Sequence, residues 1–246
     1  MTLLRVQGVS KRFGGLLAVD GASLSVAEGA IVGLIGPNGA GKTTLFGVIS
    51  GFIPPTAGRI HYDGADLTGE PPHRRAQAGI ARTFQIVQPF AGLSVVENIA
   101  VGAYLRHSRR ADATRIATDI ARRLGLGGML DQPASSLTVA GRKRLELARA
   151  LATGPRLLLL DEVLAGLNPS EIRDIIPLIQ AIQAEGVAIL MIEHVMQAVM
   201  NLCEHVYVLA QGRIIAEGMP QAICVDPLVI EAYLGHGAAG RMQDHA

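Results

Sequence analysis

The sequence predicts an α/β fold whose core is a mostly parallel sheet, and three observations support this prediction. Short apolar runs typical of strands alternate with segments of helical periodicity over the second half of the chain. Two of these runs, residues 157–161 and 187–192, are almost entirely apolar, as expected for parallel strands covered on both faces. A third apolar strand, over 30–35, leads through a glycine-rich turn directly into a helix.

Composition limits the classes of protein that the chain represents. It has 246 residues, of which 49% are hydrophobic, and a formal net charge of +1. This length suits one large α/β domain or two small ones, and the near-neutral charge gives no support for nucleic-acid binding. No apolar run approaches the roughly 18–20 residues of a membrane span, so we expect a soluble, cytoplasmic protein that reaches a membrane only through a partner. Cys203 and Cys224 are expected to be buried or idle thiols in a reducing compartment.

The predicted elements follow one another in a simple order. Residues 3–35 predict three short strands in an N-terminal antiparallel β portion, and residues 58–67 predict a hairpin that turns at Asp63–Gly64. Residues 94–125 have a helical pattern. The remaining elements are expected in this order: a helix from 142, a strand over 157–161, a helix over 170–184, a strand over 187–192, a helix over 195–202, strands over 205–216 and a helix pair over 220–235.

Three clusters of basic residues interrupt the otherwise balanced charge. Arg74–Arg75 and Arg106–Arg110 are expected to be solvated. Arg142–Arg144 are expected in the first turn of a helix, where the macrodipole disfavours cations. Either solvent screens these three charges or an anion binds at that helix N-terminus.

The turn after the strand over 30–35 has the sequence GPNGAGKT, which fits the P-loop pattern between a strand and a helix over 43–50. Glycines allow successive backbone N–H groups to converge on phosphate oxygens. Lys42 is expected to reach the β- and γ-phosphates, and the Thr43 hydroxyl to bind Mg²⁺. The alternative is a glycine turn that only links strand to helix. The motif predicts a nucleoside triphosphate site formed by Gly36, Pro37, Asn38, Gly39, Ala40, Gly41, Lys42 and Thr43.

Two acidic residues, Asp161 and Glu162, follow the leucine-rich strand directly. In an open α/β sheet, ligands bind beyond the carboxyl ends of the strands. Asp161 is therefore expected to hold Mg²⁺, and Glu162 to orient and deprotonate the attacking water. The next strand ends at Glu193–His194, and if it neighbours the leucine-rich strand, His194 lies near the γ-phosphate. A purely structural histidine is the alternative.

Taken together, these segments resemble the ATP-binding subunits of ABC transporters, and more narrowly those of bacterial branched-chain (hydrophobic) amino-acid importers. The resemblance covers nearly the whole chain and includes KRFGGLLAVDGASLSV, LIGPNGAGKTTLF, RTFQIVQPFAGLSVVENIAVGA, LARALATGPRLLLLDEVLAGLNPSE, MIEHVMQAVM and VIEAYLG. The importer subtype rests chiefly on RTFQ, AGLNP, IEHVM and AYLG. The resemblance implies a P-loop ABC-type ATPase with a mostly parallel sheet core, an N-terminal antiparallel β subdomain and an inserted helical subdomain.

The same resemblance implies a single ABC ATPase domain over residues 1–236. Its β and RecA-like core is expected at about 1–92 and 153–236, and the helical subdomain, which contains the signature region, at about 93–152. A loose tail is expected over 237–246.

The resemblance also assigns roles to single positions. Phe13 matches the aromatic that stacks on adenine, with a core phenylalanine as the alternative. Gln85 matches the glutamine that contacts Mg²⁺ and the attacking water, His194 the switch histidine, and residues 165–168 the loop that contacts the partner subunit. Walker A extends to Thr44. The implied catalytic residues are Lys42, Gln85, Glu162 and His194, and the implied metal ligands are Thr43, Gln85 and Asp161.

The family signature, approximately Leu-Ser-Gly-Gly-Gln, is altered here to Leu137-Thr138-Val139-Ala140-Gly141. Thr138 keeps a hydroxyl for the γ-phosphate, but Ala140 replaces a glycine that permits close approach, and Gly141 replaces the glutamine. Two ATPase subunits sandwich ATP in this family, so an altered signature affects the site on the partner. We hypothesise an asymmetric heterodimer with a second, homologous ATPase subunit. Two further departures are Val163 and Val195, where the family usually has proline and aspartate.

The resemblance implies that ATP hydrolysis drives import through two transmembrane permease subunits served by a solute-binding protein. The chain is expected to be peripheral at the cytoplasmic face of the cell membrane, with ATP and Mg²⁺ as cofactors. Branched-chain amino acids are the favoured solutes, with amides, urea and small acids as alternatives. Two other functions stay open: the ATPase of an exporter, and a soluble ABC protein in translation or DNA repair. The second kind usually has two ATPase domains or a long coiled-coil insertion, whereas this sequence predicts one domain and a modest helical segment.

Overall fold

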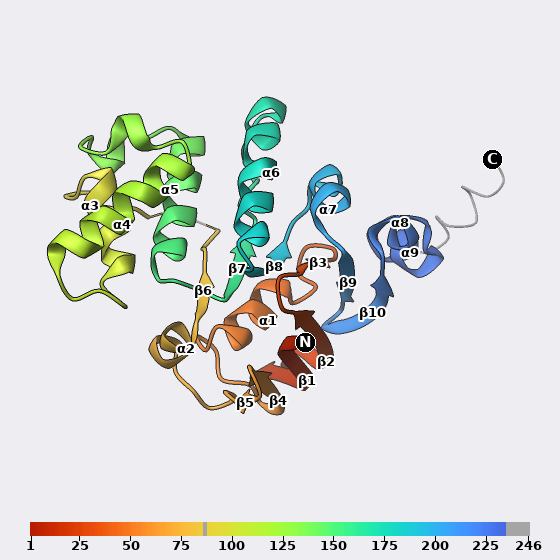
Figure 1. The fold of residues 1–246 in the computed structure, drawn as a ribbon. Helices are drawn as coiled ribbons and strands as arrows, with labels where there is room; N and C mark the ends of the chain where they lie inside the picture. Colours follow the sequence, from red (N-terminus) through yellow and green to blue (C-terminus); the bar gives the residue numbers. More distant parts are fainter. Residues whose placement is uncertain (86–87, 235–246) are drawn as a thin grey trace.

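The computed structural model describes residues 1–85 and 88–234, and the predicted loose tail over 237–246 lies outside them. Within the described residues, the strands form two sheets (Figure 1). One is antiparallel, with the order β2-β1-β4-β5, and consists of β1 (Thr2–Phe13), β2 (Leu16–Ala27), β4 (Ala57–Tyr62) and β5 (Ala65–Asp66). Asp63 and Gly64 make the turn between β4 and β5 with positive φ, as the hairpin prediction requires.

The second sheet has the order β10-β9-β3-β8-β7-β6. Every neighbouring pair in it is parallel except β9 with β10. The predicted fold class, a mostly parallel sheet core beside an antiparallel β portion, is therefore confirmed. Its strands are β3 (Ile31–Ile35), β6 (Ile80–Arg82), β7 (Leu157–Asp161), β8 (Ala188–Ile192), β9 (His205–Ala210) and β10 (Arg213–Gly218).

β3 belongs to the parallel sheet, so its expected place in the N-terminal antiparallel portion is wrong. All 5 residues of β3 are buried, whereas buried and exposed residues alternate along much of β2. A strand with two buried faces needs a layer of structure on each side. The neighbours of β3 are β8 and β9, which come from the far end of the chain. A local sequence pattern carries no information about such a pairing.

The described residues form nine α-helices, of which α1 to α7 lie between strands and α8 and α9 follow the last strand. The chain segments that precede α1 and follow β7 and β8 all lie at the same edge of the parallel sheet. The sequence analysis missed α2 and β6, which are short elements. None of the helices described is both long and apolar enough to cross a membrane. The helices are α1 (Lys42–Ile49), α2 (Pro72–Ala78), α3 (Val95–Ala103), α4 (Arg110–Arg123), α5 (Val139–Ala152), α6 (Pro169–Ala184), α7 (Met196–Leu202), α8 (Pro220–Val225) and α9 (Pro227–Leu234).

The alternation of side chains along β7 separates two hydrophobic cores. Leu157 and Leu159 pack in a core that contains Phe46 of α1 and the inner face of the antiparallel sheet. Leu158 and Leu160 point to the opposite core, which contains residues of α3 to α7. Helix α1 is thus held between the two sheets, while α3, α4 and α5 pack against one another away from the antiparallel sheet (Figure 1).

Arg75 of α2 contradicts the expectation that the Arg74–Arg75 cluster is solvated. The residue is only 1% exposed. Val48 and Ile49, in the last turn of α1, each accept a hydrogen bond of 2.7 Å from its Nη1, at the negative end of the helix macrodipole. The guanidinium also donates to the carbonyls of Glu70 and Thr68. Residues 106–110, in contrast, are exposed as expected.

α5 begins at Val139 rather than at 142, because the Thr138 side chain caps it by accepting a hydrogen bond from the Gly141 N–H (3.1 Å). Residues 142–144 therefore lie in the second turn, and the prediction that they occupy the first turn is wrong. Two of these cations have local partners, which are the Leu137 carbonyl for Arg142 and the Asp174 carboxylate for Arg144.

The substitution Arg75→Met keeps an unbranched side chain but removes the donor from a group of buried carbonyls. We predict that the free energy of unfolding falls by about 3 kcal/mol or more, because each buried polar group that loses its partner costs about 1–3 kcal/mol. Urea unfolding followed by circular dichroism measures this change. The matched control is Arg74→Met at the exposed neighbouring position, which should change stability by less than about 0.5 kcal/mol. Equal effects of the two substitutions would contradict the structural role of Arg75.

Candidate functional site

The loop between β3 and α1 is built so closely against the backbone of other strands that two of its positions require glycine. A Cβ at Gly36 would lie 1.9 Å from the Leu209 carbonyl oxygen, and one at Gly41 would lie 2.3 Å from the Ala18 carbonyl oxygen. Both glycines also have φ between +100° and +150°, at 148° and 104°. The loop therefore lies in close contact with the backbone of β2 and β9, directly before the N-terminus of α1.

Lys42 opens α1 and folds back over the same loop. Its Nζ donates hydrogen bonds to the carbonyls of Gly36 (2.6 Å) and Pro37 (3.0 Å). Burial lowers the pKa of Lys42, while the nearby Glu162 and Asp161 carboxylates oppose that shift. A partly desolvated ammonium at a glycine-rich helix N-terminus is suited to bind a phosphate anion.

Asp161 ends β7 and is only 1% exposed. Its Oδ2 pairs with Nη2 of Arg82 at 2.8 Å, and its backbone N–H donates to the Thr83 hydroxyl. Its other oxygen, Oδ1, is buried and accepts no hydrogen bond from the described residues. Burial raises the pKa of Asp161, and the hydrogen bond and charge of Arg82 act in the opposite direction. One carboxylate oxygen is thus free to bind a ligand.

Gln85, Glu162 and His194 meet, although each comes from a different loop. Gln85 Nε2 donates to Glu162 Oε2 at 2.6 Å, and His194 Nε2 lies 2.7 Å from Glu162 Oε1. The three residues follow β6, β7 and β8, which are neighbours in the parallel sheet. Glu162 has a φ of 51°, an uncommon backbone conformation for a residue with a side chain. The prediction for His194 required that the strand before it be a neighbour of the leucine-rich strand. The pairing of β7 with β8 confirms that the two strands are neighbours.

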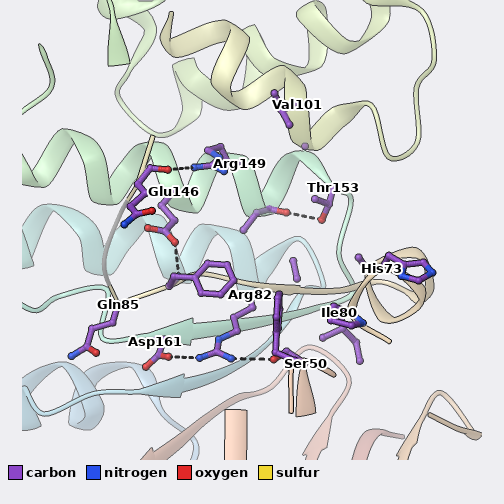
Figure 2. A pocket seen from close by; sticks show the side chains of 18 of the residues that line it. Ser50, His73, Ile80, Arg82, Gln85, Val101, Glu146, Arg149, Thr153 and Asp161 are labelled. Carbon is purple, nitrogen blue, oxygen red and sulfur yellow. Dashed lines mark hydrogen bonds and ion pairs between the residues drawn. The ribbon is translucent and has the colours of Figure 1, made fainter. Parts of the chain in front are cut away.

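A cavity of about 730 Å³ extends from Gln85 towards α3 and α5. Thr43, Gln85 and Asp161, which are the three predicted metal ligands, all line it. Figure 2 shows Asp161, Arg82 and Ser50 connected along one wall, with Glu146 and Arg149 of α5 on the opposite side.

The other predicted site residues differ in how exposed they are and in the element that carries them. Phe13 at the end of β1 is 46% exposed, with Lys11 Nζ 4.9 Å from its ring centroid, so it is no core residue. Asn38 and Thr43 are exposed, whereas Ala40 is buried. The remaining loop residues, Pro37, Gly39, Gly41 and Thr44, surround the α1 N-terminus. Thr138 caps α5 and is not among the residues that line the cavity.

Four charged residues that the sequence analysis did not assign contact this site. Arg82 pairs with Asp161, and Lys143 Nζ donates to the carbonyls of Gln85 and Glu162. Glu146 and Glu193 accept hydrogen bonds from the backbone N–H groups of Phe84 and Leu164. In the sequence, Lys143 belongs to a basic cluster and Glu193 follows an apolar strand, and neither pattern names a partner.

Comparison with known proteins identifies the family. The profile described as ABC transporter matches residues 19–165, which is more than half of the chain. The chain belongs to the ABC transporter family. A second profile, described as branched-chain amino acid ATP-binding cassette transporter, matches residues 213–239.

The similarity to relatives and to solved structures covers nearly all of this ABC ATPase. It is 41% identical to the high-affinity branched-chain amino acid transport ATP-binding protein BraF of Pseudomonas aeruginosa, over 95% of this chain and 98% of that protein. It is 40% identical to LivG of Escherichia coli K12, a protein of the same description, with the same coverage. A crystal structure of a nucleotide-free ATP-binding cassette from an ABC transporter superposes with a TM-score of 0.88 at 34% identity, covering 96% of this chain and 100% of that one.

The family membership makes this protein an ATP-binding ATPase. The ADP conformation of an ATP-binding cassette superposes almost equally well, with a TM-score of 0.87 at 34% identity and coverage of 96% and 100%. The names of the relatives do not favour a soluble protein of translation or DNA repair, nor an exporter.

Glu193 is a buried acid that connects two loops of this ABC ATPase. Its Oε1 accepts a hydrogen bond of 3.0 Å from the Leu164 N–H, which joins the end of β8 to the segment after Glu162. Burial raises the pKa of Glu193 to about 7, although the backbone N–H groups of Leu164 and His194 lower it.

The raised pKa predicts how stability depends on pH. Below about 4.5, Glu193 is protonated in both states, and between about 4.5 and 7 only the unfolded chain loses the proton, so stability falls as the pH rises. Glu193→Gln is neutral throughout. Its free energy of unfolding, relative to the unsubstituted protein, should rise by up to about 3 kcal/mol across this window, since one pKa unit is about 1.36 kcal/mol. Urea unfolding at several pH values measures the difference, and a difference independent of pH would contradict the prediction.

Proposed function

We propose that this chain is the ATP-hydrolysing subunit of an ABC importer that takes up branched-chain amino acids or related small solutes. The names of the relatives that match over 95% of the chain support this solute class, as does the branched-chain profile over residues 213–239. The meeting of Gln85, Glu162 and His194 beside the glycine-rich loop is the single observation that carries the hydrolytic role.

In the proposed site, the backbone of residues 36–44 and the Lys42 ammonium bind the phosphates, and Phe13 stacks on adenine. Lys42 leaves its two carbonyl partners to do so. The half-exposed ring of Phe13 supports the stacking role, since an exposed aromatic face is available to a base. These residues position the γ-phosphate in front of the loops that follow β7 and β8.

Mg²⁺ fits the residues that are present. Thr43, Gln85 and Asp161 line one cavity, and the buried Oδ1 of Asp161 has no hydrogen-bond donor within the described part of the chain. Hydroxyl, amide and carboxylate oxygens are the ligands that this cation prefers. When bound there, Mg²⁺ neutralises charge that develops on the phosphates.

Glu162 is the proposed general base. Its carboxylate takes a proton from water as the water oxygen attacks the γ-phosphorus, the bond from the γ-phosphorus to the β–γ bridging oxygen breaks, and ADP leaves. Gln85 and His194 hold the two carboxylate oxygens from opposite sides, at 2.6 and 2.7 Å, and so fix the direction of proton transfer. The left-handed backbone of Glu162 supports a functional role, because such conformations concentrate at active sites.

The division into subdomains follows from the same proposal. The core comprises about residues 1–92 and 153–236, and the helical subdomain about 93–152 contains α3, α4 and α5, which pack together. The α5 N-terminus with Thr138 faces the ATP of a second ATPase subunit, and residues 165–168 contact that subunit. The alteration of the signature over 137–141 favours a heterodimer.

Two permease subunits dock over the cavity, on the cytoplasmic face of the cell membrane, and a solute-binding protein delivers the solute to them. The rim of the cavity supports this docking, because Phe52 and Phe84 are exposed there with their ring centroids 5.5 Å apart. Exposed aromatic side chains are typical of protein interfaces. Gln85 lines the same cavity and so connects the docking surface to Glu162.

Glu162→Gln should abolish most ATP turnover by the assembled transporter. An amide keeps the shape of the side chain but takes no proton from water, and loss of a general base costs about 100-fold or more. Turnover is measured as phosphate release, and ATP binding by a fluorescent analogue should persist. Retention of most turnover would contradict both the role of Glu162 and the asymmetric heterodimer.

Purification from the native membrane tests the transport role. The chain should copurify with two multi-spanning membrane proteins and a second ATPase subunit. Uptake of labelled leucine by proteoliposomes that contain this complex should require ATP on the side of the ATPase subunits, and unlabelled valine and isoleucine should compete. Association with ribosomes or DNA, or ATP-driven export, would refute the proposal.

A further inference from the structure

Two charged side chains of α5 hold the backbone on both sides of Gln85. Glu146 accepts a hydrogen bond from the Phe84 N–H, and Lys143 Nζ donates to the Gln85 carbonyl oxygen (3.3 Å). The same Nζ donates to the Glu162 carbonyl oxygen at 2.9 Å. A single helix therefore contacts the backbone of both the glutamine and the proposed general base.

The burial of these two residues makes the contacts strong. Lys143 and Glu146 are each 8% exposed and lie three positions apart, on one face of α5. They do not pair with each other within the described residues, and each binds backbone groups instead. Hydrogen bonds to charged groups are about twice as strong as neutral ones, and a low dielectric strengthens them further.

The loop that contains Gln85 has little support from the sheet. β6 is an edge strand of the sheet as far as the structure describes it, where it pairs with β7, and the last sheet-like contact before Gln85 is the hydrogen bond from the Thr83 N–H to Leu159. Glu162 has a positive φ beyond the end of β7, but its N–H donates to the Ile192 carbonyl at the end of β8 (3.0 Å). Lys143 thus ties the weakly supported Gln85 loop to Glu162, which the sheet holds.

We propose that Lys143 and Glu146 form a clamp that positions Gln85 against Glu162 for hydrolysis. The clamp acts through the backbone: it fixes where the Gln85 side chain begins, and so maintains the 2.6 Å contact between Gln85 Nε2 and Glu162 Oε2. Both are positioning residues, since their hydrogen bonds go to backbone groups of the loops that carry Gln85 and Glu162. The inference rests on the proposed function of Gln85 and Glu162. Because Lys143 and Glu146 both belong to α5, a displacement of this helix also displaces Gln85 relative to Glu162.

The first test compares Lys143→Met with Lys143→Arg in the full chain assembled with its partner subunits. Methionine keeps the apolar stem but donates no hydrogen bond, so kcat should fall by about 100-fold, the loss expected when a catalytic group is misplaced by about 1 Å. KM for ATP should stay within about twofold, because the substitution removes no contact that binds ATP equally in the ground state and in the transition state. Arginine still donates to both carbonyls and should restore most of kcat. Arg115→Met, at an exposed position on α4, is the charge-matched control and should leave kcat unchanged.

Two variants of Glu146 test the clamp independently of Lys143. Glu146→Gln keeps an oxygen that accepts from the Phe84 N–H and should keep most of kcat, whereas Glu146→Leu should lower kcat with KM unchanged. This pair carries the test if Lys143→Met does not fold, as checked by thermal unfolding. Equal kcat in all four Lys143 and Glu146 variants would overturn the inference.

A double-mutant cycle separates positioning from general support of the fold. If Lys143 acts through Gln85, the variant Lys143→Met with Gln85→Ala should be no slower than Gln85→Ala alone. Multiplicative losses would overturn the clamp. This test is separate from that of the proposed function, which Glu162→Gln tests. If Glu162→Gln abolishes turnover, but Lys143→Met leaves kcat unchanged or its loss multiplies with that of Gln85→Ala, only the clamp is wrong.

Discussion

Parallel pairing of β7 with β6 on one side and β8 on the other brings three loops to one edge of the sheet. Gln85, Glu162 and His194 follow these strands within a few residues, so their side chains converge although they lie far apart in the sequence. β3 lies on the other side of β8 and delivers the glycine-rich loop to the same edge. If this strand order changed, the glycine-rich loop and the three proposed hydrolytic residues would no longer face one another.

Buried charge is the second organising feature of the molecule. Asp161, Lys143, Glu146 and Arg75 are nearly inaccessible to solvent, and each has a partner that compensates for its desolvation. The partners are mostly backbone groups at the ends of helices and strands. Buried charges in this protein therefore fix the positions of segments rather than simply neutralise one another. The exception is the pair of Arg82 and Asp161, which leaves one carboxylate oxygen available.

Helix α5 combines contacts that the sequence presents as separate motifs. Its N-terminus is capped by Thr138, whose side-chain oxygen accepts a hydrogen bond from the Gly141 N–H. One turn further along, Lys143 reaches the loops after β6 and β7. The cations that looked unfavourable at a helix start are therefore placed in the second turn and bound by carbonyls and a carboxylate.

The sequence by itself determined the fold class, the strand over 157–161 and the glycine-rich loop, because these depend on local periodicity and on motifs of fixed spacing. It also indicated the hairpin at Asp63–Gly64, since that turn needs residues that tolerate positive φ. It misplaced β3 and the start of α5, and it took Arg75 for a solvated residue. Only the tertiary structure decided these points, together with the contacts of Lys143 and Glu146, because the partner of a buried charge or strand lies far away along the chain and leaves no periodic trace in the sequence around it.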